Sequence, residues 1–465
     1  MPEVVIIGGG IAGLATAYEL SRRNVSFLVL EERSRAGGVI LSEQIDGFTI
    51  DGGPDSLIVQ KREGIALCQE LGLGDRLVPT LPPRLAYIQR GGRLHPLPAA
   101  SVMGIPTKFG PFIRTKLFSW PGKMRMGAEW FVPAKKDDAD ESIGSFIGRR
   151  FGREAVEFLA EPLLAGIHAG DVDRLSIRAL FPRFVEAERK HGSLLRAFSR
   201  PNPESQIPNP DGVFRSLPGG LSELVDALVR VLPRDSIALG ATVERIERGE
   251  GFCIHAANRP PIRARTLVVA APAFAAATML RGVDADLSAA CGSVPYASAA
   301  TVALAFDRSA VAHPLTGSGY VVPRAENPAI LAASWLSSKW PHRAPAGKVL
   351  MRTFLGGARD PRALDQSDAE LVRLSLDAIT PILGISAPPL FSRLYRWNRA
   401  NAQHDVGHLA RMQSIERALA KHPGLFVTGS GFRGVGIPDC VADGRATGKA
   451  VAEFLTAARP KMANG

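Results

Sequence analysis

Cysteine is scarce in this chain. The 465 residues contain four cysteines, Cys68, Cys253, Cys291 and Cys440. No two of them have the C-x-x-C spacing of zinc knuckles and dithiol redox centres. We therefore expect no metal site, and isolated thiols favour a reducing compartment such as the cytoplasm.

Long hydrophobic runs are also absent. The longest nearly unbroken apolar run, residues 267–280, is too short to span a bilayer and contains Pro272. It predicts a buried strand that turns into a helix. No basic-then-apolar leader precedes the first predicted strand, so we expect no secretory signal. No Ser-His-Asp set, carboxylate pair or metal-ligand spacing stands out either, and we expect no catalytic side chain.

The first residues carry a specific pattern. The apolar run VVII at residues 4–7 precedes the motif G-x-G-x-x-G at residues 8–13, and a helical pattern follows. A second apolar run, FLVL at residues 27–30, ends at Glu31. Glycines in such a turn let backbone N–H groups approach a pyrophosphate at a helix N-terminus, and the acid accepts from a ribose hydroxyl. The pattern predicts dinucleotide binding.

The motif continues beyond Glu31. Residues 33–38 read RSRAGG, and residues 47–56, GFTIDGGPDS, form a strand-like segment with a second glycine turn. The combined string from G-x-G-x-x-G through E-x-x-x-R-x-G-G resembles the two-part FAD fingerprint of the amine oxidase and phytoene desaturase superfamily. Many members carry arginine after the glycine pair, where this chain has Val39. That difference points away from ordinary amine oxidases.

A narrower resemblance extends along nearly the whole chain. The chain is similar to the oxygen-dependent protoporphyrinogen and coproporphyrinogen oxidases, flavoenzymes of haem biosynthesis. The matching strings, in order, are GPDS at 53–56, MGIPTKFGPF at 103–112, EPLLAGIHAGDVDRLSIRALFP at 161–182, KWPH at 339–342, VGH at 406–408 and GVGIPDC at 434–440. The GIPTK and KWPH strings resemble the Gram-positive branch, which acts on coproporphyrinogen III. Where the family often has Pro-Gln-Tyr, this chain has Ala402, Gln403 and His404.

The resemblance implies a non-covalently bound FAD that performs the hydride abstraction itself. The C-terminal glycine segment of this superfamily returns to the flavin and opens a helix whose positive N-terminus stabilises charge on the reduced ring. The implied cofactor-binding residues are Gly8, Gly9, Gly10, Ile11, Ala12, Gly13, Glu31, Glu32, Arg35, Gly38, Val39, Gly53, Pro54, Asp55, Ser56, Val243, Trp397, Ser430, Val435, Gly436 and Ile437.

The implied substrate is a porphyrinogen, an apolar tetrapyrrole with propionate groups, and oxygen is the co-substrate. Lys61 is a candidate propionate partner, although an exposed lysine at a helix start would look the same. Ile167, Val321 and Phe354 resemble positions that clamp the macrocycle, although generic core residues would also look the same. His168 and His404 are the nearest candidate bases. Coproporphyrinogen III, which has four propionates, is favoured over protoporphyrinogen IX, with hydrogen peroxide as by-product.

These assignments predict an α/β (α+β) fold with three parts. A discontinuous, Rossmann-like FAD-binding domain takes residues 1–83, 213–295 and 396–465. A mixed-sheet substrate domain takes residues 84–98 and 296–395, and a helical, membrane-facing lobe takes residues 99–212. The proline-rich stretch 201–212 predicts a linker.

The helical lobe is rich in bases and aromatics. Residues 105–136 carry seven bases and one acid, interleaved with six phenylalanines and tryptophans. With the net charge of +11, this favours an anionic partner. We expect a peripheral contact with the inner face of the cell membrane, although a core of aromatics under solvated bases fits equally well. Nucleic acid is not expected, because no recognition motif is present.

Two other functions share part of the pattern. Another FAD enzyme, an amine oxidase or a desaturase, would share the fingerprint but lack the porphyrinogen-type strings. A non-catalytic flavin- or tetrapyrrole-binding protein would share every string and lack turnover. The resemblance also implies a second protein partner, the next enzyme of the haem pathway.

Overall fold

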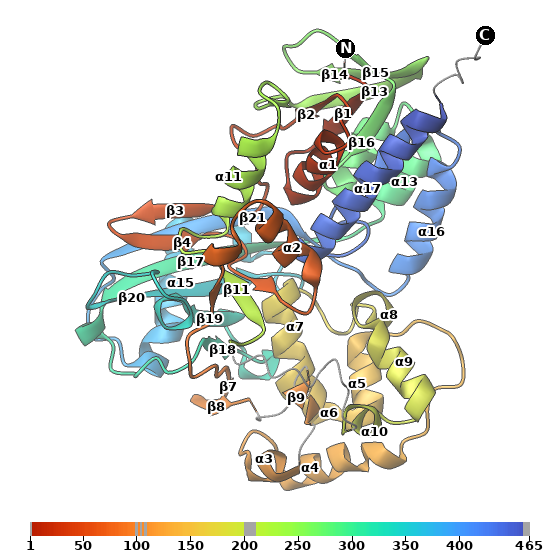
Figure 1. Cartoon of the computed structure of the whole chain (residues 1–465). Coiled ribbons are helices and arrows are strands. Elements are labelled where there is room, and N and C mark those ends of the chain that lie inside the picture. The colour runs from red at the N-terminus through yellow and green to blue at the C-terminus, as the bar shows by residue number, and fades with distance from the viewer. Residues whose placement is uncertain (1, 98–100, 103–104, 107–108, 200–210, 459–465) are drawn as a thin grey trace, which may run out of the picture.

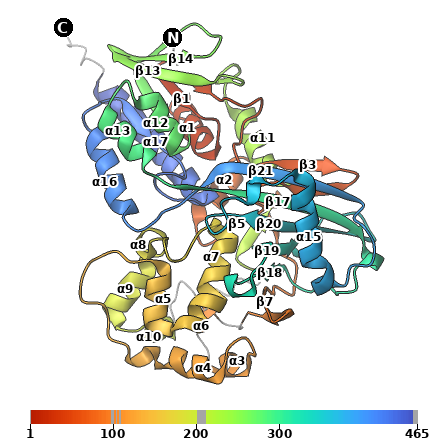
Figure 2. The ribbon, with the colours of Figure 1, turned by 180° about the vertical axis from the view of Figure 1, so that it is seen from behind.

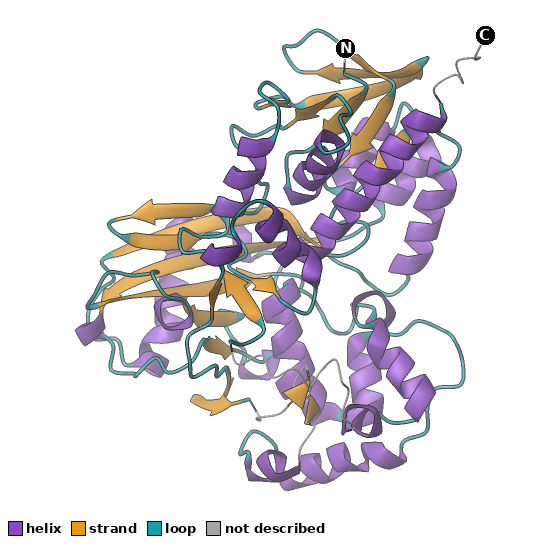
Figure 3. Cartoon of the chain, in the orientation of Figure 1, coloured by secondary structure: helices purple, strands orange, loops and turns teal. Residues whose placement is uncertain are grey.

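The structure, a computed structural model, describes residues 2–97, 101–102, 105–106, 109–199 and 211–458. The chain folds into two sheet-containing parts and a group of helices below them (Figures 1 and 3). Most of the stretch 201–212, and residues 103–104 and 107–108 of the MGIPTKFGPF string, lie outside the described residues. A mixed α/β fold, as predicted, is confirmed.

The first sheet is parallel throughout. Its strand order is β12-β2-β1-β16-β22. The strands are β1 (Val4–Ile7), β2 (Phe27–Leu30), β12 (Ile237–Ala238), β16 (Thr266–Val269) and β22 (Leu425–Val427). Strands from the start, middle and end of the chain therefore lie side by side. The predicted strand-to-helix stretch 267–280 forms β16 and α12 (Ala273–Leu280), as expected.

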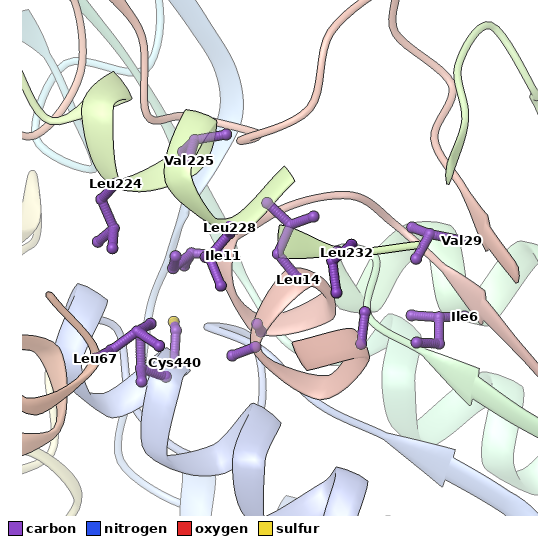
Figure 4. Close-up of a cluster of buried hydrophobic side chains, with 14 of the residues drawn as sticks. Ile6, Ile11, Leu14, Val29, Leu67, Leu224, Val225, Leu228, Leu232 and Cys440 are labelled. Carbon is purple, nitrogen blue, oxygen red and sulfur yellow. The ribbon is translucent and has the colours of Figure 1, made fainter. Parts of the chain in front are cut away.

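Helices and a small sheet cover the two faces of this parallel sheet. One face packs on α1 (Ile11–Ser21), α2 (Arg62–Glu70), α11 (Ser222–Val231) and α17 (Ile437–Ala457). Figure 4 shows this core, in which Ile6 and Val29 of the strands meet Leu14 of α1 and Leu228 of α11. The other face packs on α12, α13 (Ala285–Gly292), α16 (His408–Leu419) and the sheet β13-β14-β15 (Val243–Gly249, Gly251–Ala256, Ile262–Ala264).

The second large sheet has seven strands and is mixed, as predicted. Its order is β21-β17-β20-β19-β18-β7-β8, and only β18 and β7 pair in parallel. The bounds are β7 (Tyr87–Arg90), β8 (Arg93–Pro96), β17 (Tyr296–Asp307), β18 (Gly319–Val321), β19 (Ala332–Trp335), β20 (Lys348–Gly356) and β21 (Phe391–Ala402). Helix α15 (Asp368–Leu383) packs on one face. Strand β21 runs through the predicted domain boundary at residue 396.

Small strands connect these parts. The hairpin β3 (Ser42–Ile45) and β4 (Phe48–Asp51) precedes the GPDS turn. Strand β11 (Phe214–Ser216) joins β5 (Leu57–Ile58) to β6 (Val78–Pro79). The chain also forms β9 (Ser101–Val102) with β10 (Ile105–Pro106).

Helix α14 (Leu336–Lys339) follows β19 of the second sheet, and helices α3 to α10 form a lobe around their own apolar core (Figure 2). They are α3 (Phe109–Arg114), α4 (Trp120–Gly127), α5 (Ile143–Phe151), α6 (Arg153–Ala155), α7 (Glu161–His168), α8 (Ile177–Leu180), α9 (Pro182–His191) and α10 (Leu194–Ser199). The completely buried Arg150 pairs with the equally buried Glu129 and with Glu188. Helix α7 reaches from this lobe to the seven-stranded sheet, where Gly166 lies against Val321.

Candidate functional site: the two glycine segments

The first glycine turn connects β1 to α1 and depends on two glycines. Gly8 has a φ of +110°, and a Cβ there would lie 2.7 Å from the Ala270 carbonyl oxygen. A Cβ on Gly13 would lie 2.0 Å from the carbonyl oxygen of Gly8. The turn and the close packing of helix on strand therefore exclude side chains at both positions.

Gly10 is glycine for another reason. It is the N-cap of α1, it has an ordinary φ of −70°, and a Cβ on it would have no atom within 4 Å. The fold itself therefore has room for a side chain at this position. The first backbone N–H groups of a helix have no partner within the helix, and they make its N-terminus an anion-binding position. The open space at Gly10 fits a pyrophosphate at that position.

Glu31 lies beside this turn. Its side chain is buried, one carboxylate oxygen accepts from the Gly9 N–H at 2.6 Å, and the other accepts from the Arg33 N–H at 3.0 Å. These two bonds hold the carboxylate at the end of β2. Each oxygen retains a lone pair that can accept from a ribose hydroxyl.

The second part of the fingerprint folds over the first. The Gly37 N–H donates to the Gly9 carbonyl at 2.8 Å, and Gly38, at a φ of +60°, approaches the Cα of Gly10. Arg35 donates to three carbonyls of its own loop, those of Ala36, Gly38 and Ile40. Burial lowers the pKa of Arg35. Its guanidinium therefore stabilises the conformation of this loop through hydrogen bonds to the loop carbonyls.

The GPDS turn meets this loop. A Cβ on Gly53 would lie 1.9 Å from the Val39 carbonyl oxygen, and the Trp397 indole N–H donates to Gly52 at 2.9 Å. The Val39 side chain is exposed and Trp397 is half-buried. The structure thus brings Val39, Gly53 and Trp397 together from three distant segments.

Asp55 is held by the KWPH string. Its buried carboxylate accepts from the Lys339 ammonium at 2.8 Å and from the Trp340 indole N–H at 3.0 Å, and Arg352 lies 3.6 Å away. Burial alone would raise the pKa of Asp55, but Lys339 and Arg352 hold it well below its usual range. The Ser56 hydroxyl donates to the same carboxylate. Asp55 therefore anchors the GPDS turn to the second sheet.

The C-terminal glycine segment opens α17. Gly436 is its N-cap, and the Gly436 N–H donates to the Asp439 carboxylate at 3.3 Å. Gly434 has a φ of +130°, and a Cβ there would clash with Asp439 at 2.6 Å. Only glycine fits the entry to this helix.

Helix α17 runs alongside α1. The Thr16 hydroxyl donates to the Gly444 carbonyl at 2.9 Å, and a Cβ on Gly444 would lie 2.3 Å from the Ala12 carbonyl oxygen. Further along, Gly448 lies next to Glu19. Because residue numbers increase in the same direction along both helices, the helices run parallel. From this register, the first residue of α17 lies about one turn, roughly 5 Å, before the first residue of α1 along their common direction. Two helix N-termini thus lie near each other, at staggered heights.

Two stacked histidines support the segment before α17. The His404 and His408 rings lie 3.8 Å apart, and both side chains are buried. Their Nε2 atoms lie 3.0 Å from the Ser430 carbonyl oxygen and 2.9 Å from that of Phe432. Donation to these carbonyls fixes the segment that contains Ser430. The VGH string alone gave no indication of this pairing.

We expect this pair to make the protein sensitive to acid. Burial, together with nearby His404, lowers the pKa of His408 from 6.5 to about 4, with Arg411 adding to the shift and Asp140 opposing it. Between these values the unfolded chain binds a proton that the folded chain does not, so stability falls as the pH drops. The loss should reach roughly 3 kcal/mol by pH 4. Urea unfolding at pH 7, 6 and 5 measures it.

His408→Gln is the matched variant, because an amide can still donate to the Phe432 carbonyl but does not titrate. Its free energy of unfolding should depend less steeply on pH between 6.5 and 4. Identical pH dependence in the variant and the unmodified protein would contradict the assignment.

Lys61, the predicted propionate partner, already has a partner in the structure. It is the N-cap of α2, its side chain is half exposed, and its ammonium lies 2.6 Å from both carboxylate oxygens of Asp439. His168 lies near this ion pair, and both partners affect its pKa. Burial, followed by His404 and Lys61, lowers the pKa of His168 to about 4, and Asp439 opposes the shift. The sequence did not predict Asp439, in the first turn of α17, as the partner of Lys61.

Two of the three predicted substrate-clamping residues, Val321 and Phe354, share one sheet face. Val321 pairs with Ala332, which pairs with Phe354, so the three side chains form a row across β18, β19 and β20. Val321 and Phe354 are both half-buried. The row lies on the face opposite α15, and Gly166 of α7 packs against it. The backbone of Ile167 is in α7, but its side chain lies outside the described part of the structure.

The other predicted cofactor residues occupy less defined positions. Ile11 and Ala12 are buried in α1, Glu32 is exposed just after β2, and Pro54 is half-buried. Val243 is half-buried at the start of β13. Val435 and Ile437 flank the N-cap of α17.

Comparison with known proteins identifies the family. Residues 11–452 match the family of flavin containing amine oxidoreductases. The chain is 37% identical to a coproporphyrinogen III oxidase of Bacillus subtilis, over 98% of both chains, and 32% identical to that of Staphylococcus aureus, over 97% of this chain and 98% of the other.

Solved structures agree. A protein from Exiguobacterium, provisionally named protoporphyrinogen oxidase, superposes with a TM-score of 0.86 at 33% identity, over 97% of this chain and 98% of the other. Cyclohexylamine oxidase from Brevibacterium oxydans superposes with a TM-score of 0.72 at 18% identity, over 98% of this chain and 99% of the other, a likeness of fold alone. The chain belongs to the flavin containing amine oxidoreductase family.

Proposed function

We propose that this chain oxidises coproporphyrinogen III to coproporphyrin III in haem biosynthesis, using FAD and oxygen and releasing hydrogen peroxide. The observation that carries the proposal is similarity over 98% of its length to a coproporphyrinogen III oxidase at 37% identity. Protoporphyrinogen IX is the second candidate substrate, because the chain is also 28% identical to a chloroplastic protoporphyrinogen oxidase of rice.

The residues around the two helix N-termini fit FAD. The N-terminus of α1 at Gly10 would hold the pyrophosphate, Glu31 a ribose, and the N-terminus of α17 at Gly436 the isoalloxazine ring. When bound, FAD supplies the hydride acceptor for the reaction. The offset of the two helices along their common direction suits a ligand that extends from one N-terminus to the other.

We propose that FAD is bound without a covalent link. Cys440 is the thiol nearest the start of α17, but its side chain is buried and lies 3.5 Å from the Gly434 carbonyl oxygen. Burial, with Asp439 and Asp443 nearby, raises the pKa of Cys440 to about 12. Because the thiolate is the reactive form, this cysteine is unsuited to attach a flavin.

We propose that the porphyrinogen lies between the α17 N-terminus and the row of Val321 and Phe354. An apolar wall formed by half-buried side chains would fit the macrocycle. A propionate that approaches Lys61 has to compete with Asp439, which already holds the ammonium at 2.6 Å. His168 is uncharged near neutral pH, so a pyrrole proton can pass to it or to water.

We propose three domains that differ slightly from the sequence expectation. The FAD-binding domain combines the start, the middle and the end of the chain, because β1, β16 and β22 belong to one parallel sheet. The substrate domain extends to Ala402, because β21 pairs with β17 up to Tyr296. The helical lobe contains α3 to α10.

We also propose that the helical lobe rests on an anionic membrane surface, which would make this a cytoplasmic protein with a peripheral membrane contact. Five large apolar side chains in and just after α3 and α4 are exposed: Ile113, Trp120, Met124, Trp130 and Phe131. Arg114 and Lys116 are exposed beside them. Among the described residues, no helix is long and apolar enough to cross a bilayer. We propose that this patch makes the membrane contact.

The structure changes which bases can serve this contact. Lys123 is buried, its ammonium donates to the Ile113 carbonyl at 2.7 Å, and it lies over the Trp120 ring. Arg125 donates to two carbonyls of α5. These bases hold the lobe together. Of the six predicted surface aromatics, Phe112 and Phe118 are core, Trp120, Trp130 and Phe131 are exposed, and the side chain of Phe109 lies outside the described residues.

Charge reversal tests the membrane contact. Arg114→Glu with Lys116→Glu should release most of the protein from vesicles that contain anionic lipid, since each base near such a surface contributes about 1 kcal/mol. High salt should have the same effect on the unmodified protein. Sedimentation with vesicles measures the bound fraction.

The matched control reverses two exposed lysines elsewhere, Lys421→Glu with Lys449→Glu. This variant should stay bound like the unmodified protein. Equal recovery on neutral and anionic vesicles, or equal release of both double variants, would show that the patch does not meet a membrane.

The choice of substrate is tested by comparing kcat/KM for coproporphyrinogen III and protoporphyrinogen IX. Each propionate that meets a cation should add about 1–3 kcal/mol, or about tenfold or more in kcat/KM. We expect coproporphyrinogen III to be preferred. A clear preference for protoporphyrinogen IX would replace the proposed substrate, and oxidation of an amine alone would assign the chain to the amine oxidases.

A further inference from the structure

A cluster of three side chains on the β13–β14 hairpin has no role in the flavin or porphyrinogen chemistry. It consists of Glu247, Cys253 and His255. Glu247 pairs directly with Cys253 across the two strands, and His255 lies two residues along β14. All three side chains therefore point to the same face of the hairpin. The opposite face carries Ile246, Phe252 and Ile254, which are buried in the core.

The three potential ligand atoms converge. The Cys253 sulfur lies 3.6 Å from His255 Nε2, and the same nitrogen lies 3.1 Å from a Glu247 carboxylate oxygen. All three atoms lie within 4.8 Å of one another. A tetrahedral zinc ion, with bonds of about 2.3 Å to sulfur and about 2.0–2.1 Å to nitrogen and oxygen, needs ligand separations of roughly 3.6 Å and 3.3 Å. The two separations that involve His255 Nε2, 3.6 Å to sulfur and 3.1 Å to oxygen, are close to these.

The cluster is accessible and is built on paired strands. The Glu247 side chain is about half exposed at 49%, and His255 retains 20% exposure. The other three cysteines are buried, so Cys253 is the only half-exposed thiol of the described chain. Three protein ligands with solvent above them leave a fourth position for water.

Two arginines face the same cluster. Arg245 pairs with His255 across the strands and bonds to Glu247, and Arg263 pairs with Cys253 from β15. Both charges oppose binding of a cation. Arg245 bonds to one carboxylate oxygen of Glu247 and His255 faces the other, so a metal ion on the second oxygen would lie beside the Arg245 charge. This proximity gives the site a property that can be tested.

We propose that Glu247, Cys253 and His255 bind one zinc ion, or another divalent ion of similar softness. Thiolate, imidazole and carboxylate are all zinc ligands, and such a mixed set disfavours magnesium and calcium. Binding releases the Cys253 thiol proton to solvent and requires a neutral His255, so affinity falls with acid. The ion would link β13 to β14 and stabilise the hairpin that begins at Val243.

Zinc titration of the untagged, flavin-loaded protein, in competition with a chromogenic zinc indicator, tests the proposal. We expect one tight zinc ion per chain and a higher Tm with zinc. Cys253→Ser and His255→Gln should each weaken binding by about tenfold or more. With cobalt as the probe, a thiolate-to-cobalt charge-transfer band should appear in the unmodified protein and be absent in Cys253→Ser.

Two further variants make the test specific. Arg245→Gln should strengthen zinc binding, because it removes the competing cation from Glu247. Glu250→Gln changes the charge at the hairpin turn without removing a proposed ligand, and should bind zinc like the unmodified protein. Unchanged stoichiometric binding in both Cys253→Ser and His255→Gln, or no binding of zinc to the unmodified protein, would overturn the proposal.

Discussion

Gly10→Val is expected to yield a folded protein that retains no FAD. A Cβ at Gly10 meets no atom of the protein within 4 Å, so the substitution leaves the packing intact. The same side chain would occupy the proposed pyrophosphate position at the α1 N-terminus. Loss of two charge-assisted hydrogen bonds there costs about 3–6 kcal/mol, or at least a hundredfold in affinity. The flavin absorption of the purified protein, with its Tm, measures both effects.

Two variants serve as controls for this result. Gly249→Val places the same side chain in open space at the end of β13 and should leave the protein yellow. Gly13→Ala should lower the Tm itself, because its Cβ would lie 2.0 Å from the Gly8 carbonyl oxygen. A Gly10→Val protein that keeps a full complement of flavin would contradict the proposed cofactor position.

Lys339→Met is expected to destabilise the protein by about 3–5 kcal/mol, the cost of leaving a buried carboxylate without its partner. Lys339 and Asp55 are both largely buried, at 14% and 9% exposure, and lie 2.8 Å apart. Arg352 at 3.6 Å compensates only in part. Urea unfolding measures the loss, and a changed flavin spectrum would report movement of the GPDS turn.

The matched control is Lys348→Met. Lys348 pairs with Asp307 at the surface, where both side chains are at least one-third exposed, so the loss should be under about 1 kcal/mol. Adding Asp55→Asn to Lys339→Met should recover part of the stability, since the uncompensated charge disappears. Equal effects of the two lysine variants would show that the Lys339–Asp55 pair does not anchor the turn.

Acid should weaken the same pair. Asp55 has a folded-state pKa below its unfolded value, so its contribution to stability is present above about pH 4. It is lost as the pH falls toward the lower pKa. This loss begins below the range in which His408 titrates, so the two effects are separable.

The local patterns of the sequence predicted the elements around the proposed flavin site well. Apolar runs with a glycine motif between them gave β1, α1 and β2, because burial in a parallel sheet and helix entry both leave local traces. The C-terminal glycine segment was also expected to open a helix, and α17 begins at Ile437. The mixed character of the second sheet was also predicted.

Contacts between distant segments could not be predicted from the sequence. Lys61 was selected as a propionate partner, but its ion pair with Asp439 joins residues 378 positions apart. The bond from Lys339 to Asp55 spans 284 positions. Neither has a local pattern, since each depends on how distant segments of the chain pack together. Glu247 and Cys253 were missed because strand pairing, and not C-x-x-C spacing, brings them together.

The sequence also did not distinguish surface residues from core residues in the helical lobe. Lys123 and Lys116 look alike in the sequence, yet one is buried and the other is exposed. The aromatic residues divide in the same way, with Phe118 buried and Phe131 83% exposed. Helix α4 has only eight residues, which is too short for its hydrophobic pattern to reveal which side faces the core of the lobe.

We propose that the chain is a porphyrinogen oxidase that turns over with bound FAD. To test this, the purified yellow protein is mixed with coproporphyrinogen III in air, and porphyrin fluorescence and peroxide are followed together. We predict that both rise in constant proportion, that removing oxygen stops both, and that Gly10→Val forms neither above the uncatalysed background. Flavin-loaded protein that binds the tetrapyrrole but produces neither porphyrin nor peroxide would contradict the claim and identify a non-catalytic binding protein.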